Sequence, residues 1–372
     1  MKIVLLGGEP IYLARFRGHL LRTLKERGHR VLAWAGAYDL EVERELQAAG
    51  IGFATFPFQR TGLRPNRELA TLFTLYRMLQ RERPDLVITT TPKVIGYGGL
   101  AARWAGIPRS IALVTGLGMA FDSPRHLVDR VRTRCAQRIL QSALTHSSLV
   151  AFYNADDRNT LLDLGVIQRQ HPTLLLQGSG VDVAYFSASA VPSNPVTFLL
   201  LGRLLHSKGV MDFVSAAQQL KQPHPQVRFQ LLGDLDAAHP HSIGSRQLQQ
   251  AQRAGIEYLG YQKDVRPYLN AATVVVVPSQ QREGLPRVIL EAFATGRPVI
   301  ASDIPGCRHA VTPGKTGWLV PPRSVAALQT AMLDVVQHPK RATTLGPLCR
   351  AEAERRFAVE RVTQQLVDAF ET

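Results

Sequence analysis

The fold is decided by the stretch SQQREGLPRVILEAFATGRPVIASDIPG, which runs from Ser279 to Gly306. It begins just after the apolar run TVVVVP and includes a second apolar run, PVIASD, so a helical pattern lies between two buried strands. A strand, a loop, a helix and a second strand form one unit of a parallel sheet, and such sheets bind ligands at the carboxyl ends of their strands. Glu283 in the loop and Glu291 in the predicted helix are therefore candidate ligand contacts.

The start of this helix has the features of an anion site. Pro286 suits the first helical position, where its missing N–H costs nothing, and Gly296 suits the helix end. The unpaired N–H groups of the first turn and the positive end of the helix dipole favour a diphosphate. A carboxylate on each side of that diphosphate would hold a sugar and a ribose by their hydroxyls, as a nucleotide sugar requires. The alternative is that Glu283 and Glu291 are solvated charges, and spacing alone does not decide between the two.

The whole chain alternates short apolar runs with longer amphipathic ones, which indicates parallel βα units. With 372 residues and 45% hydrophobic content, it is long enough for two domains. Gly, Ser and Pro gather between Leu174 and Pro195, so we place the joint there. The strands predicted on either side of the joint are KIVLLG, RVLAWA, DLVITT, SIALVTG and SLVAFY, then VTFLLLGRL, VRFQLLGD, IEYLGY, TVVVVPS and PVIASD.

Composition narrows the functional classes. The formal net charge is +15 and the excess leans toward the N-terminal half, but no helix-turn-helix, zinc-finger or RNP signature accompanies it, so we expect no nucleic-acid partner. Anionic lipid, a diphosphate ligand or a generally basic surface remains. The three cysteines are far apart, which fits a reducing compartment, and no apolar run reaches the roughly 18 residues that a membrane span needs.

Beyond these local signals, the residues resemble a known family. REGLPRVILEAFATGRPVIASDIPGCRHAV is similar to the Glu-x7-Glu segment of retaining GT-B glycosyltransferases of family 4, and LLGRLLHSKGV, YLGYQKDVRPYLNAATVVVVPS and GSGVDVAYF resemble further segments in the same order. TTPKVIGYGGLAARWAGIPRSIALVTGLG resembles the subgroup that extends undecaprenyl-diphosphate-linked sugars in bacterial polysaccharide or glycan assembly. The resemblance covers nearly the whole chain.

The resemblance implies an α/β GT-B fold, with two Rossmann-like doubly wound domains facing a cleft. Residues 1–182 would bind the acceptor and residues 183–357 the nucleotide sugar, with a C-terminal helix, 358–372, packing back on the first domain. Glu283 would hold hydroxyls of the transferred sugar, Glu291 the ribose, and Arg203 and Lys208 the diphosphate. The further residues of the nucleotide-sugar site would be Gly202, Tyr261, Gly284, Leu285 and Pro286.

The acceptor side departs from the family's usual pattern. Many members have a histidine in the N-terminal domain near the reacting sugar, but the corresponding loops here read TTTPKVIGYGG and VTGLG. The subgroup shares this pattern, so the acceptor-site candidates are Gly8, Lys93, Thr115 and Gly116. The simplest consistent mechanism is front-face transfer, in which the departing phosphate oxygen takes the acceptor proton.

Neither a metal nor a cofactor is expected. Asp234 to Asp236 form an Asp-x-Asp, which holds a divalent metal in another glycosyltransferase fold, but here they follow a strand where GT-B enzymes have a Gly-Asp turn. The Gly7-Gly8 pair lacks the third glycine of a dinucleotide loop. The cations at Arg203 and Lys208 would stabilise the leaving diphosphate instead.

A basic amphipathic helix is predicted between Ser123 and Leu144, with an apolar stripe through Cys135 and arginines mostly off the stripe. Such helices lie on anionic membranes, although the stripe would equally suit a protein core. The resulting hypothesis is a cytoplasmic enzyme, peripheral to the inner membrane face, that moves an N-acetylhexosamine or hexose from a UDP-sugar to a polyprenyl-diphosphate-linked saccharide. A non-hydrolysing UDP-sugar epimerase and a nucleotide-binding protein without turnover are the alternatives.

Overall fold

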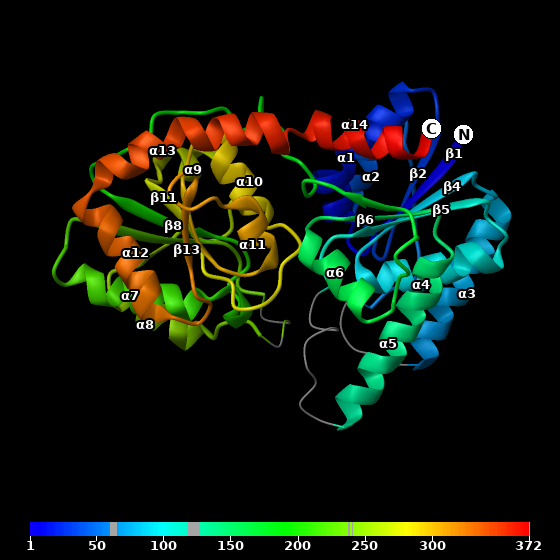
Figure 1. Ribbon diagram of the computed structural model, residues 1–372, viewed down its shortest axis with the longest axis horizontal. Coiled ribbons are helices and arrows are strands. Elements are labelled where there is room, and N and C mark those ends of the chain that lie inside the picture. The colour runs from blue at the N-terminus through cyan, green and yellow to red at the C-terminus, as the bar shows by residue number, and fades with distance from the viewer. Residues whose placement is uncertain (60–64, 118–126, 237–238, 240, 372) are drawn as a thin grey trace. The chain divides into compact units, whose positions relative to one another are not determined.

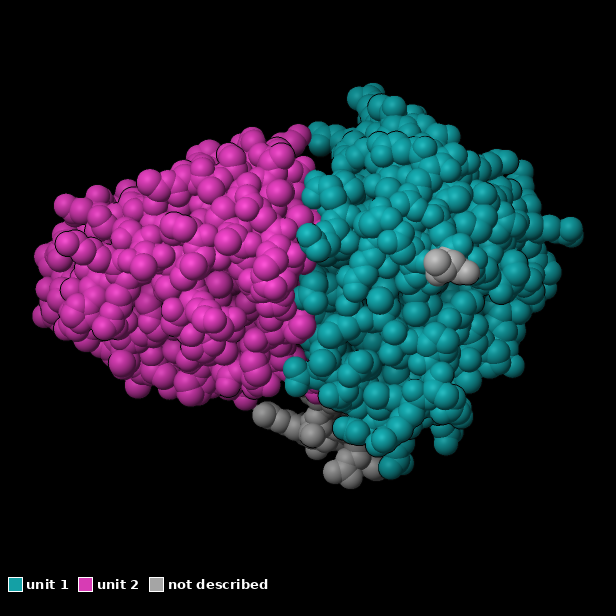
Figure 2. All heavy atoms as spheres, turned by 45° about the horizontal axis from the view of Figure 1, so that its top comes forward, with its two compact units in different colours: residues 1–179, 360–372 teal, residues 180–359 magenta. Residues whose placement is uncertain are grey.

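The chain forms two compact units. The structure is a computed structural model, and it describes residues 1–59, 65–117, 127–236, 239 and 241–371. Unit 1 contains Met1–Ser179 and Glu360–Thr372, and unit 2 contains Gly180–Val359 (Figure 2). These limits differ from the predicted domain boundaries by at most three residues.

Unit 1 is built on a parallel sheet of seven strands in the order β3-β2-β1-β4-β5-β6-β7 (Figure 1). The order runs in opposite directions from β1 and β4, so the loops after these two strands diverge and leave a crevice between them. The strands are β1 Lys2–Leu6, β2 Arg30–Ala35, β3 Gly52–Thr55, β4 Leu86–Thr90, β5 Arg109–Val114, β6 Leu149–Phe152 and β7 Thr173–Leu175.

Helices connect these strands, and the last helix of the chain belongs to the same unit. Figure 1 shows α14 lying along α1, where His19 Nδ1 is 3.0 Å from Thr363 Oγ1 and Arg27 donates to Gln364 at 2.8 Å. The C-terminal helix therefore packs on unit 1. The helices of unit 1 are α1 Pro10–Glu26, α2 Leu40–Ala48, α3 Pro65–Glu82, α4 Pro92–Trp104, α5 Leu127–Thr145, α6 Ala155–Asp163 and α14 Val359–Glu371.

Unit 2 repeats the plan with six parallel strands in the order β10-β9-β8-β11-β12-β13. Its crevice lies between β8 and β11. The strands are β8 Thr197–Leu201, β9 Arg228–Leu232, β10 Glu257–Tyr258, β11 Val274–Val277, β12 Val299–Ser302 and β13 Gly317–Val320. The helical segments are η2 His206–Lys208, α7 Val210–Lys221, α8 Ser245–Arg253, α9 Arg266–Ala271, α10 Arg287–Ala294, α11 Pro305–Ala310, α12 Val325–Gln337, α13 Pro339–Glu352 and a π-helical turn, η3 Ala353–Phe357.

The central strands are buried on both faces, as the unbroken apolar runs predict. Every residue of β11 is buried, and in register Val275 pairs with Val299 of β12 and with Leu199 of β8. In Figure 1, α7, α8 and α12 cover one face of this sheet, and their apolar side chains share one core with β8 and β9. The doubly wound α/β architecture predicted for both halves is confirmed.

Three strands were not predicted: β3, β7 and β13. Each lies at an edge of its sheet, where only one neighbour pairs with it, and all have partly exposed residues. An edge strand needs no continuous apolar run, so the pattern that identified the others is weak here. One helix boundary also differs, since Pro286 is the N-cap of α10 and Arg287 is the first helical residue.

Candidate active site

The candidate donor site lies at the crevice of unit 2, where the loops after β8 and β11 leave the sheet. β8 ends at Leu201 and its loop leads through Arg203 into η2, which ends with Lys208. β11 ends at Val277 and its loop carries Glu283. Because β8 and β11 are neighbours, side chains 75 positions apart in the sequence meet at one edge of the sheet.

Lys208 and Glu283 form a two-point ion pair. The Lys208 ammonium donates to both carboxylate oxygens, at 2.6 Å to Oε1 and 2.7 Å to Oε2. The Ser279 hydroxyl also donates to Glu283 Oε1, which fixes the carboxylate from the strand side. An ammonium has three N–H groups, so this arrangement leaves Lys208 one further donor for a phosphate oxygen.

Two glycines allow the loops around this pair to approach closely. A Cβ on Gly209 would lie 1.9 Å from the Pro278 carbonyl oxygen, and Gly209 also has φ +71°, a conformation that favours glycine. A Cβ on Gly306, at the start of α11, would lie 2.6 Å from the carbonyl oxygen of Glu283 and 2.4 Å from that of Gly284. The backbone on both sides of the ion pair is thus fixed by contacts that a larger residue would break.

Arg203 supplies a second cation with unused hydrogen-bonding capacity. Its Nη1 is buried and has no hydrogen-bond partner among the described residues. A buried N–H group without a partner costs roughly 1–3 kcal/mol, so such a group points to a missing ligand. An anionic oxygen in the crevice would satisfy it. Arg203 and Lys208 both stand on the loop after β8, as the predicted diphosphate site requires.

The start of α10 adds the positive end of a helix dipole. The helix begins after Pro286, directly behind the loop that carries Glu283, and in the described structure no side chain caps it, so the dipole favours an anion there. Leu285 and Gly284 are buried just before it. Glu291, one turn into the helix, accepts a hydrogen bond from Arg287 Nε at 2.8 Å, and its side chain is 15% exposed. Both glutamates are therefore partly buried and paired with a cation, whereas solvated charges would be exposed.

The remaining predicted donor residues lie on loops of the same sheet edge. Gly202 follows β8 directly, with φ +145°. Tyr261 stands on the loop after β10 and is 58% exposed, and the preceding Gly260 accepts a hydrogen bond from Gly233 of the loop after β9. Tyr261 is thus exposed at the same edge of the sheet, on the loop of the strand that lies two places from β8.

The acceptor candidates lie in unit 1, on three neighbouring strands. Gly8 follows β1, Lys93 stands in the first turn of α4 after β4, and Thr115 with Gly116 follows β5. All four are therefore at the carboxyl edge of one sheet, beside the crevice between β1 and β4. Lys93 donates to Glu68 Oε1 at 2.8 Å, and sequence patterns gave no sign of this partner.

Three further predictions concern the Asp-x-Asp triplet, the basic helix and the absence of a membrane span. Asp234 and Asp236 follow β9, and the described residues contain no cluster of three or more metal-ligating side chains. The predicted basic helix is α5, but the side chains of residues 127–132 are outside the described part. Cys135 is exposed, so at that position the apolar stripe is not part of the core of unit 1. No described helix is both long enough and apolar enough to span a membrane.

Family models match both units. One described as "Glycosyl transferase 4-like domain" matches residues 13–171, and one described as "Glycosyl transferases group 1" matches residues 195–338. Two curated relatives match over 82% of this chain. They are N,N'-diacetylbacillosaminyl-diphospho-undecaprenol alpha-1,3-N-acetylgalactosaminyltransferase of Campylobacter jejuni, 26% identical with 81% of its length covered, and UDP-Gal:alpha-D-GlcNAc-diphosphoundecaprenol alpha-1,3-galactosyltransferase of Escherichia coli, 25% identical with 79% covered.

Solved structures agree on the fold. Anabaena HepE in complex with UDP has a TM-score of 0.79 at 22% identity, with all of both chains covered. Sucrose-phosphate synthase from Thermosynechococcus elongatus has a TM-score of 0.81 at 21% identity, covering 100% of this chain and 98% of that one. With two doubly wound units, a candidate anion site at the crevice of the second and family models across both, the chain belongs to the glycosyltransferases of the GT-B fold.

Proposed function

We propose that this protein transfers a sugar, an N-acetylhexosamine or a hexose, from a UDP-sugar to a polyprenyl-diphosphate-linked saccharide with retention of the anomeric configuration. The observation that carries the proposal is the Lys208–Glu283 ion pair and the unpartnered Nη1 of Arg203, both at the crevice of the unit that matches the group 1 glycosyltransferase model. The two curated relatives named above act on undecaprenyl-diphosphate-linked sugars, and this supports the acceptor class.

In this proposal each residue has a distinct task. As the bond between the anomeric carbon and the phosphate oxygen breaks, negative charge grows on the diphosphate, and Arg203 and Lys208 stabilise that charge more strongly than they stabilise the bound donor. Glu283 holds Lys208 in position and accepts hydrogen bonds from sugar hydroxyls, and Glu291 does the same for the ribose. The acceptor oxygen attacks from the face that the diphosphate leaves, and its proton passes to the departing phosphate oxygen.

The test is a screen of UDP-sugars with a short-chain isoprenyl-diphosphate saccharide as acceptor. We expect transfer from one or a few donors, an α product from an α-linked donor, and the same rate after treatment with a chelator, since two cations and a helix N-terminus stand where other folds use a metal. A β product would overturn retention. Isomerised UDP-sugar without an acceptor would favour the epimerase, and UDP binding without turnover would favour a binding protein.

We also propose that α5 contributes to attachment at an anionic inner-membrane surface. Arg134 and Arg138 are exposed on this helix, and each cation near an anionic surface contributes about 1 kcal/mol. Changing both to Gln should therefore weaken co-sedimentation with anionic vesicles by roughly tenfold or more, and salt should release the unchanged protein. The matched control changes Arg246 and Arg253, both exposed on α8, to Gln. Equal loss in the two variants would indicate a general charge effect and remove α5 from the proposal.

A further inference from the structure

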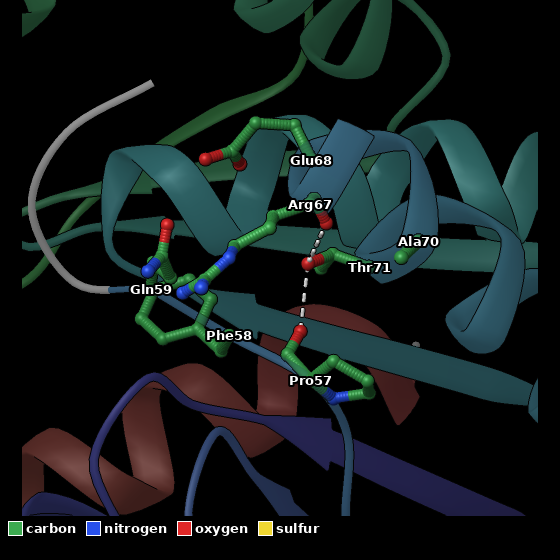
Figure 3. A pocket seen from close by; sticks show the side chains of 7 residues that line it. All are labelled: Pro57, Phe58, Gln59, Arg67, Glu68, Ala70 and Thr71. Carbon is green, nitrogen blue, oxygen red and sulfur yellow. Dashed lines mark hydrogen bonds between the residues drawn. The ribbon is translucent and has the colours of Figure 1, made fainter. Parts of the chain in front are cut away.

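A pocket of about 350 Å³ lies in unit 1, between the segment that follows β3 and the first turns of α3. Its walls include Phe58 and Gln59 from the segment and Arg67, Glu68 and Thr71 from the helix. Figure 3 shows Arg67 and Glu68 extending from α3 toward the side on which Gln59 lies, and the Thr71 hydroxyl joining the helix to the segment through a 2.7 Å hydrogen bond to the Pro57 carbonyl. The volume is at the lower end of the usual range for small-molecule sites, about 300–1,000 Å³.

Glu68 is a buried carboxylate in this wall. The residue is 8% exposed, and its Oε1 accepts a 2.8 Å hydrogen bond from Lys93 of α4. Burial and Glu68 together raise the pKa of Tyr97, which donates a hydrogen bond to the same carboxylate. A carboxylate accepts about four hydrogen bonds, so the two donors leave it capacity for a ligand hydroxyl.

The pocket lies at the carboxyl edge of the sheet, where ligands bind in this fold. Lys93 joins the end of β4 to the pocket segment, since its ammonium also donates to the Gln59 carbonyl at 2.6 Å. Phe58 packs against the ends of β1 and β2, because a Cβ on Gly8 would lie 3.0 Å from the Phe58 ring and one on Gly36 only 2.5 Å from it. Loops after four strands therefore converge on this site.

We propose that this pocket is the subsite for the saccharide of the acceptor, with Glu68 as the group that recognises its hydroxyls. The proposal rests on the transferase function above and names the part of the acceptor that unit 1 recognises. The buried carboxylate accepts hydrogen bonds from sugar hydroxyls, while Lys93 and Arg67 nearby balance its charge, so hydrogen bonding recognises the saccharide. Phe58 provides an apolar surface for a sugar ring, and the Gln59 amide both donates and accepts.

Lys93 acts as a positioning residue in this arrangement. Its ammonium donates to the Glu68 carboxylate and so fixes the direction in which the remaining lone pairs of that carboxylate point. Arg67 and Gln59 line the same pocket and are available to a second ring substituent, such as an N-acetyl carbonyl. The specificity for one acceptor sugar over another would then depend on these two residues, while Glu68 supplies affinity for the sugar as such.

The experiment measures binding, so it does not depend on turnover. Citronellyl diphosphate is compared by isothermal titration calorimetry with citronellyl diphosphates that carry α-linked GlcNAc, GalNAc, galactose or glucose. The ratio of the two dissociation constants isolates the contribution of the sugar. We expect at least one sugar to tighten binding about tenfold or more, the scale of a hydrogen bond to a charged group, and Glu68→Gln to abolish that gain while binding of citronellyl diphosphate itself is unchanged.

The matched control is Glu82→Gln. Glu82 lies on the same helix and is also paired with a lysine, since Lys2 Nζ is 2.8 Å from its Oε2, but it does not line the pocket. Glu82→Gln should leave the sugar-dependent gain as it is. The subsite is overturned if Glu68→Gln keeps the full gain, or if no sugar of the panel tightens binding to the parent protein. Release of UDP from a UDP-sugar tests the donor site separately, so failure of the subsite and failure of the proposed function give different results.

Discussion

Glu283→Gln is expected to lower turnover by at least about two orders of magnitude, on the scale of losing an electrostatic contact to the transition state. The carboxylate receives both contacts from Lys208, at 2.6 and 2.7 Å. A glutamine has one carbonyl oxygen for the ammonium, and its NH2 group would face a cation. In the proposed mechanism Lys208 would then lose the position from which it contacts the leaving diphosphate, and the sugar would lose a hydroxyl acceptor.

UDP binding separates this effect from unfolding. The contacts proposed for the nucleotide are Glu291, Arg203, Lys208 and the start of α10. Glu283→Gln disturbs only Lys208 among them, so the dissociation constant of UDP should change by less than about tenfold when turnover falls a hundredfold or more. Rates are measured at saturating donor and acceptor. Near-parental turnover would remove Glu283 from the mechanism, and loss of UDP binding would assign it to the nucleotide site instead.

Two further variants sharpen the result. Glu257→Gln breaks another ion pair of unit 2, with Arg228 at 2.6 Å on the outer strands, and should leave turnover unchanged. Lys208→Met should be as damaging as Glu283→Gln, and the double variant should be little worse than either alone, because the pair acts as one unit. Additive losses would show that the two residues act independently.

The sequence predicts the central strands because a strand that is buried on both faces consists of an unbroken run of apolar residues, as in VVVV of β11. The edge strand β13, GWLV, begins with a glycine and is partly exposed, so its pattern resembles a loop. Only pairing with β12, from Val299 opposite Gly317 to Ser302 opposite Val320, identifies it as a strand. Pairing is a property of the folded sheet and cannot be read from four residues.

The same limit applies to the site. Glu283 and Lys208 were each singled out, but their contact depends on β8 lying next to β11, which follows from the strand order rather than from spacing along the chain. Ser279, within the quoted stretch, was not predicted to hold Glu283, because a serine after a strand is common in any turn. Glu68 was missed for a similar reason: its role depends on Lys93, 25 positions away.

Arg297, also within the quoted stretch, has a structural role that its sequence context does not indicate. The side chain is fully buried, and its guanidinium donates to carbonyl oxygens of Leu269 at 2.9 Å, Asn270 at 2.7 Å and Ser189 at 2.8 Å. Burial lowers its pKa to about 10, so the group is still charged at pH 7. The hydrogen bonds of one cation, just before β12, thus link the end of α9 to the segment around Ser189.

Arg297→Met is expected to destabilise unit 2 by about 3 kcal/mol or more, because each buried carbonyl left without a partner costs roughly 1–3 kcal/mol. Arg297→Lys keeps the charge but offers three donors in place of five, so it should cost less than the Met variant. The matched control is Arg308→Met, ten positions further along. Its side chain is 50% exposed and pairs with Asp303, so its removal should change stability by within about 0.5 kcal/mol.

Urea unfolding followed by tryptophan fluorescence measures these differences. The chain has three tryptophans, and in a background with Trp34→Phe and Trp104→Phe the remaining one, Trp318 of β13, reports on unit 2. The transition seen by Trp318 should move to lower urea in the order Arg308→Met, Arg297→Lys, Arg297→Met, with slopes that stay equal if only stability changes. A Met variant as stable as the parent would mean that the carbonyls find other partners or water, and that Arg297 is not what holds the segment around Ser189 in place.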